Sequence, residues 1–148
     1  MAKAKREPSR KYTTTYNFQL FVGMKDIATG KTATMDKVRK LVDYCCRDCM
    51  CCLTVTPTEF IYPSPGPWPR RHEKGVIIGL INYPRFPKSL TELLQTMDVT
   101  AWYMMKNLNQ CHVTYTYEEG TCMLTNLEQI YKVEAIRAKE DKKKKNKK

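Results

Sequence analysis

The 148-residue chain lacks the apolar segments that mark membrane and secreted proteins. No apolar run approaches the ~18 residues that a membrane-spanning helix needs, and the longest clear run, residues 76–81, is interrupted by Gly79. The basic residues of the first eleven positions are followed by no apolar segment of the kind found in secretory signals. We therefore expect a cytoplasmic protein that makes no contact with a membrane.

Recognisable catalytic motifs are missing as well. The chain has only two histidines, no G-x-S-x-G or H-E-x-x-H motif and no carboxylate pair in a suggestive setting. Cys111 and His112 are neighbours, but adjacent residues of a strand point to opposite faces and do not cooperate directly. These absences predict a protein that is not an enzyme and needs no cofactor.

The net charge of +11 resides almost entirely in the two ends of the chain. The first eleven residues hold five basic residues and one acidic residue, and residues 137–148 hold eight and two. The intervening residues 12–136 therefore carry a net charge of only +1. We predict a disordered basic tail over residues 1–11, one α+β domain over 12–138, and a disordered lysine-rich tail over 139–148.

Hydrophobic periodicity and turn residues divide the body into strands and helices. Alternation predicts strands, and Pro57 favours an edge position for the second of them, whereas the wholly apolar third strand is expected to be central. Thr34 is a suitable N-cap, and the pairs Ser89–Glu92 and Thr125–Glu128 form capping boxes. The predicted elements are strands at 16–25, 51–62, 75–83, 111–117 and 121–124, and helices beginning near 34, 89 and 126.

The order of these elements is β-α-β-β-α-β, followed by an extra strand and helix. This order is typical of the ferredoxin-like fold, in which two helices cover one face of an antiparallel sheet. The alternative is another α+β sandwich built from the same elements. Over residues 16–124 the chain resembles small single-domain ferredoxin-like proteins of phages and mobile elements. The resemblance rests on the element order, the strand YNFQLFVGMKD and the turn NLNQ, and it assigns no functional residue.

Five of the seven cysteines lie close together, at positions 45, 46, 49, 51 and 52. They form two overlapping C-x-x-C motifs, a spacing that zinc sites favour. Of the candidates for a second ligand pair, which are His72, Cys111, His112 and Cys122, only Cys122 could approach the cluster in the predicted topology. Cys45 and Cys49 also share the helical spacing of the buried residues. We therefore predict free thiols without a metal.

Two further segments invite a functional interpretation. Residues 29–32 (TGKT) resemble the end of a phosphate-binding loop, but Lys25 occupies the position where that loop needs glycine, so we expect a plain turn. The loop 62–73 has proline at every second position from 63 to 69, which makes it extended and stiff. It either carries a function or lies as a rigid cover over the sheet, anchored by Trp68.

In a ferredoxin-like sheet, the loop 25–31, the proline loop and the turn 109–112 meet at one edge. This edge would gather cations, amides and an aromatic ring that suit a nucleotide-like anion. The predicted ligand-binding residues are Lys31, Trp68, Arg70, Arg71, His72, Asn109 and Gln110. We therefore predict a non-catalytic module that binds or sequesters a small anionic ligand, or a protein partner, through this edge.

Two other kinds of partner remain open. Val99, Trp102 and Tyr103 form a second apolar face on the long helix, which suits either a partner or the C-terminal helix. We expect Trp102 to lie beneath the C-terminal helix, and we still expect a homodimer or higher homo-oligomer because open sheets of this kind pair readily. The lysine-rich tail would give weak, salt-sensitive contact with nucleic acid. The alternative function is thus a basic-tailed nucleic-acid-binding accessory protein.

Overall fold

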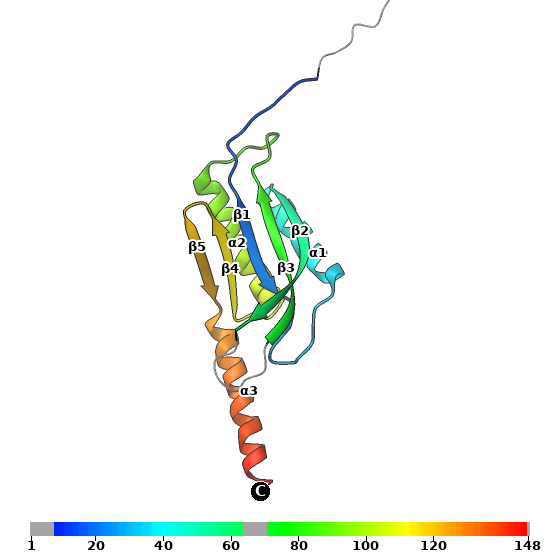
Figure 1. Cartoon of the computed structure of the whole chain (residues 1–148), viewed down its shortest axis with the longest axis vertical. Coiled ribbons are helices and arrows are strands. Elements are labelled where there is room, and N and C mark those ends of the chain that lie inside the picture. The colour runs from blue at the N-terminus through cyan, green and yellow to red at the C-terminus, as the bar shows by residue number, and fades with distance from the viewer. Residues whose placement is uncertain (1–7, 64–70, 148) are drawn as a thin grey trace, which may run out of the picture.

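The computed structural model describes residues 8–63 and 71–147. Eight elements follow one another: β1 (Phe18–Gly23), α1 (Met35–Cys49), β2 (Cys52–Tyr62), β3 (Arg71–Ile81), α2 (Leu90–Asn107), β4 (His112–Tyr117), β5 (Gly120–Thr125) and α3 (Leu127–Lys145). The strands form one antiparallel sheet in the order β2-β3-β1-β4-β5 (Figure 1). The ferredoxin-like fold is therefore confirmed, with β5 added next to β4.

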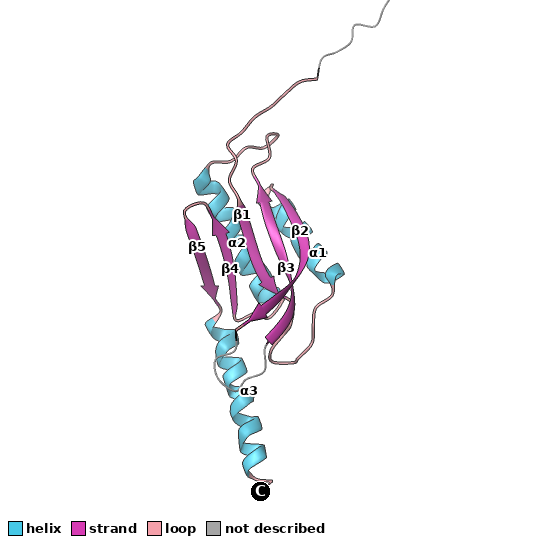
Figure 2. Ribbon diagram, viewed as in Figure 1, coloured by secondary structure: helices cyan, strands magenta, loops and turns pink. Residues whose placement is uncertain are grey.

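Helices α1 and α2 cover one face of the sheet and leave the other face open (Figure 2). The alternating residues Leu20 and Val22 of β1 and Ile78 of β3 point to the helices and are fully buried. They pack against Leu93 and Met97 of α2. Burial of each such side chain contributes about 1.5–3 kcal/mol, so this layer holds the sheet and helices together.

The β2–β3 hairpin is longer than the sequence predicted. Residues 71–74 were expected in the proline loop, but they belong to β3, where Arg71 pairs with Tyr62 and Glu73 with Phe60. β1 ends at Gly23, opposite Gly75, so the hairpin extends past the end of its neighbour. The sequence does not indicate this extension because residues 71–74 of β3 are all polar and join the sheet through cross-strand pairing rather than through burial.

Local capping residues place the starts of the helices. The Thr34 side chain accepts a hydrogen bond from Lys37 N, and the Ser89–Glu92 capping box is complete, as predicted. The third helix is capped by Asn126, whose side chain accepts from Gln129 N, and not by Thr125. Thr125 is unsuited to the cap because it is still paired with His112 in the sheet.

Helix α3 continues to Lys145, so residues 139–145 are helical where a disordered tail was expected. Alanine, glutamate and lysine favour the helix, and the terminal lysines interact well with its negative end. The helix projects beyond the end of the sheet instead of covering α2 (Figure 1). Trp102 accordingly remains 46% exposed, with Lys106 Nζ 5.5 Å from its ring centroid, so the expected burial of Trp102 beneath α3 is wrong. Among the described helices, none is long and apolar enough to cross a membrane.

Candidate functional site

Two connections, the β1–α1 loop and the α2–β4 turn, meet at the end of the sheet where β1 stops, as the topology predicted. The Asn109 side-chain amide donates to Asp26 Oδ2 at 3.0 Å, and Gln110 Nε2 donates to the carbonyl of Lys25 at 2.9 Å. These two bonds join the α2–β4 turn to the loop after β1. The loop itself is a plain turn, closed by hydrogen bonds between Asp26 and residues 28–31.

The overhanging end of the β2–β3 hairpin curls across this end of β1 (Figure 1). Its curvature places the Glu73 carboxylate directly above Gly23. A Cβ atom at Gly23 would overlap Glu73 Oε1 and would lie 2.6 Å from Gln110 Oε1. Only a residue without a side chain leaves room for both groups, so Gly23 is a structural requirement of this arrangement.

Glu73 is half-buried and held by two donors. Lys25 N donates to its Oε1 at 3.3 Å, and the Tyr62 hydroxyl donates to its Oε2 at 3.3 Å. Partial burial of the phenol, the charge of Glu73 and their hydrogen bond together raise the pKa of Tyr62. Tyr62 therefore keeps its proton at neutral pH and remains a donor to the carboxylate.

Aromatic rings lie beside the carboxylate. The Phe60 ring meets that of Phe21 edge to face, with centroids 6.4 Å apart, and lies 6.2 Å from the ring of Tyr62. Phe60 covers Gly75 so closely that a Cβ atom there would overlap its ring. A carboxylate next to aromatic faces suits a cationic group that also carries apolar substituents.

Gln110 forms the inner wall of the site and is only 6% exposed. Its Nε2 donates to the carbonyls of Lys25 and Leu108, both at 2.9 Å. These two acceptors determine the orientation of the amide and direct Oε1 toward Gly23 and Glu73. Gln110 was predicted to be a ligand-binding residue, and the structure places it within reach of Glu73.

Among the other predicted binding residues with described side chains, Lys31, His72 and Asn109 do not gather around Glu73. Lys31 and Asn109 line a separate hollow of about 370 Å³ between the β1–α1 loop and the start of α1. His72 Nδ1 lies 3.1 Å from Glu59 Oε1, on the hairpin face opposite Glu73. Arg71 is a strand residue paired with Tyr62. Trp68 and Arg70 lie outside the described residues.

The cysteine cluster lies at the opposite end of the sheet, where α1 ends and β2 begins. Burial raises the pKa of Cys45 and of Cys51 to about 12, with smaller contributions from neighbouring thiols. Cys122 lies in β5, where it pairs with Tyr115 of β4. Because β5 is the edge of the sheet farthest from β2, Cys122 does not approach the cluster. Within residues 8–63 and 71–147, no group of three histidine, cysteine or acidic side chains is arranged to hold a metal ion.

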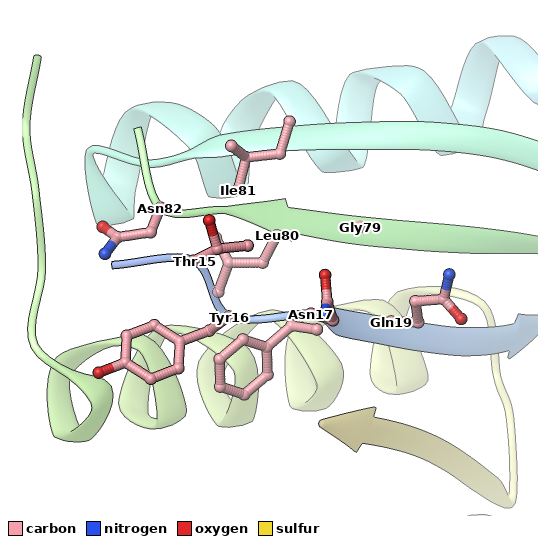
Figure 3. Close-up of a pocket in the computed structure, with 9 residues that line it drawn as sticks. Thr15, Tyr16, Asn17, Gln19, Gly79, Leu80, Ile81 and Asn82 are labelled. Carbon is pink, nitrogen blue, oxygen red and sulfur yellow. The ribbon is translucent and has the colours of Figure 1, made fainter. Parts of the chain in front are cut away.

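A hollow of about 230 Å³ lies near the same end of the sheet as the cysteines, between the start of β1 and the end of β3 (Figure 3). Asn82 borders it, but the Asn82 amide is fully engaged by the backbone of Thr14 and Lys88. The remaining lining residues include Asn17, Gln19 and Ile81. Asn82 therefore has a structural role in this hollow, because it joins the end of β3 to the segments that contain Thr14 and Lys88.

Comparison with known proteins supports the fold. The chain matches no family model and no curated protein. It is similar to a phage SAM lyase solved in complex with S-methyl-5'-thioadenosine, with a TM-score of 0.67 and 13% identity over 82% of this chain and 97% of that one. The ligand-free form of a phage SAM lyase gives a TM-score of 0.65, again at 13% identity, over 81% and 97% of the two chains. CutA from Synechococcus elongatus gives a TM-score of 0.43 at 12% identity, over 77% and 79%.

This similarity contradicts the prediction of a non-catalytic protein, because the lyase that shares the fold is an enzyme. No motif in the sequence indicates that Glu73 and Tyr62 lie together. Their spacing of eleven residues carries no motif, and they meet only because the hairpin pairs Phe60 with Glu73 and Tyr62 with Arg71. The available signal was two aromatic residues, Phe60 and Tyr62, at alternate positions of a strand whose partner carries an acid.

Proposed function

We propose that this protein is a lyase that cleaves S-adenosylmethionine, with Glu73 and Tyr62 at its active site. The observation that carries the proposal is the half-buried Glu73 carboxylate, hydrogen-bonded by Lys25 N and the Tyr62 hydroxyl and flanked by Phe60. It lies at a loop-rich end of a fold that a SAM lyase shares at a TM-score of 0.67.

The chemistry of the substrate fits this site. S-adenosylmethionine is a sulfonium cation, and aromatic faces and a carboxylate both attract such a charge. When the bond from sulfur to the γ-carbon of the amino-acid chain breaks, the bonding electron pair returns to sulfur and neutral S-methyl-5'-thioadenosine leaves. An oxygen of the substrate's own carboxylate forms the new bond to that carbon, which closes a lactone that keeps the ammonium charge and consumes no water. The proposed ligand keeps the nucleoside that the sequence suggested, but its reacting group is a cation rather than an anion.

The proposed role of each residue follows from its position in the site. Phe60 and Phe21 lie where they can contact the sulfonium and its substituents, and Glu73 supplies the negative charge. Tyr62, which stays protonated, fixes the carboxylate through the hydrogen bond to Oε2. Lys31 and Asn109 line the neighbouring hollow, which is the proposed place for a polar part of the ligand.

The test is to incubate the purified protein with S-adenosylmethionine and measure S-methyl-5'-thioadenosine by liquid chromatography and mass spectrometry. We expect product with the wild type and a loss of at least a hundredfold in the Glu73→Gln variant. Glu59→Gln is the matched control, because Glu59 is on the same hairpin but pairs with His72 on the opposite face. No product from the wild type, or equal rates for the two variants, would contradict the proposal.

We still predict a homo-oligomer, and we propose that its protomers associate through the open face of the sheet. Ile81 and Met123 are 44% and 62% exposed and belong to strands of that sheet. Exposed apolar side chains on a sheet not covered by helices favour association of protomers. Light scattering tests this, and a mass near 17.3 kDa would contradict it.

The lysine-rich end of α3 favours a second, accessory activity, contact with nucleic acid. Lys142–Lys145 occupy four consecutive positions and therefore present positive charge around the whole helix. Such an arm binds phosphates without reading sequence, and its affinity falls steeply with salt. Replacement of these four lysines by glutamine should abolish retention on a DNA column at 50 mM NaCl, while cleavage of S-adenosylmethionine is retained. Unchanged retention would exclude the arm as the contact.

A further inference from the structure

We propose that Gln110 and Glu73 form a paired acceptor above Gly23 that binds the α-ammonium group of the substrate. The inference rests on the proposed function and adds to it a specificity-determining residue, Gln110, and a positioning residue, Gly23. Its basis is a polar side chain that is 94% buried yet leaves one strong acceptor, Oε1, without a donor among the described residues.

The two oxygens converge on one point. Glu73 Oε1 and Gln110 Oε1 both lie closer to the position of a Gly23 Cβ than any real Cβ atom could approach. Both groups are hydrogen-bond acceptors in this orientation, because the amide N–H bonds of Gln110 are directed to the carbonyls of Lys25 and Leu108. Two converging acceptors, one of them charged, suit a cationic donor between them.

An ammonium group satisfies this arrangement, whereas a sulfonium does not. The ammonium group carries three N–H donors and can bind the carboxylate and the amide oxygen together. A sulfonium has no N–H and would leave Gln110 Oε1 unsatisfied, so its place is against Phe60 and Phe21. The two positive groups of S-adenosylmethionine are thereby assigned to two different parts of the site.

Gly23 allows a sharp test. Its backbone is not in the left-handed region, so alanine can adopt it, but the added methyl group would displace the Glu73 carboxylate and crowd Gln110. Gly120→Ala is the matched control, because a Cβ atom at Gly120 meets nothing within 4 Å. Both variants should fold, and circular dichroism checks this before binding is measured.

The probes are three thioethers whose sulfur is uncharged and which are therefore not cleaved: S-adenosylhomocysteine, its analogue with hydrogen in place of the α-ammonium, and S-methyl-5'-thioadenosine. Calorimetry should show that the wild type and Gly120→Ala bind S-adenosylhomocysteine at least tenfold more tightly than the deaminated analogue. In Gly23→Ala this ratio should fall to near one, while affinity for S-methyl-5'-thioadenosine changes little.

The outcomes separate the two proposals. Equal affinity of the wild type for S-adenosylhomocysteine and its deaminated analogue overturns the ammonium site, and this comparison needs no variant. An equal loss for all three probes in Gly23→Ala also overturns it. If the wild type still cleaves S-adenosylmethionine in either case, only this inference fails. If the wild type binds no probe and releases no product, the proposed function fails as well.

Discussion

Asn82 joins three segments that the sheet alone would not hold together, and its removal should cost a large part of the protein's stability. Its Nδ2 donates to Thr14 O at 2.9 Å, to Lys88 O at 3.1 Å and to Thr13 Oγ1 at 3.3 Å. Its Oδ1 accepts from Lys88 N at 2.9 Å. The side chain thus links the end of β3 to the segment before β1 and to the entry of α2.

The expected cost corresponds to about three full hydrogen bonds, because the two N–H groups of the amide are shared among three acceptors and Oδ1 accepts one bond. The Asn82 side chain is 7% exposed, so water replaces it poorly when the amide is removed. With a net contribution of about 0.5–1.5 kcal/mol for each hydrogen bond, Asn82→Ala should lower the free energy of unfolding by about 3 kcal/mol. Asn82→Asp should be worse, because a carboxylate oxygen would then face the carbonyls of Thr14 and Lys88.

Urea unfolding followed by circular dichroism measures this loss as a lower midpoint at an unchanged slope. Asn107→Ala is the matched control, because Asn107 is exposed and its side chain makes a single bond, to Tyr103 O at 2.8 Å. That variant should change the free energy of unfolding by less than about 0.5 kcal/mol. A loss below about 1 kcal/mol in Asn82→Ala would refute the view that Asn82 joins these segments.

Two further predictions concern groups whose pKa is raised by burial. Cys45 and Cys51, with pKa values of about 12, should resist a thiol reagent at pH 8 in the native protein, whereas Cys52 should react; peptide mass spectrometry checks this, and equal labelling would contradict it. Burial and the hydrogen bond to Asp98 raise the pKa of Tyr115, so the folded state holds its phenolic proton more tightly than the unfolded state. The free energy of unfolding should therefore fall as pH rises above about 10, and less steeply in Tyr115→Phe; equal slopes would contradict this.

Local sequence signals determined most of the secondary structure. Thr34 and Ser89 cap their helices because an N-cap depends on residues within one turn. Pro57 marked β2 as an edge strand for a similarly local reason, since proline donates no hydrogen bond to a neighbour. The element order then led to the ferredoxin-like sheet, because few topologies accommodate it.

The candidate site was decided by tertiary structure. Glu73, Gln110 and Gly23 come from three distant segments, and no periodicity relates them. They meet because β1 ends at Gly23 while the β2–β3 hairpin continues and curls over it. How far a hairpin continues, and which way it bends, depends on pairing and packing summed over the whole sheet. The sequence by itself therefore determined the fold and the end of the sheet where the β1–α1 loop and the α2–β4 turn meet, whereas long-range strand pairing decided which side chains meet there.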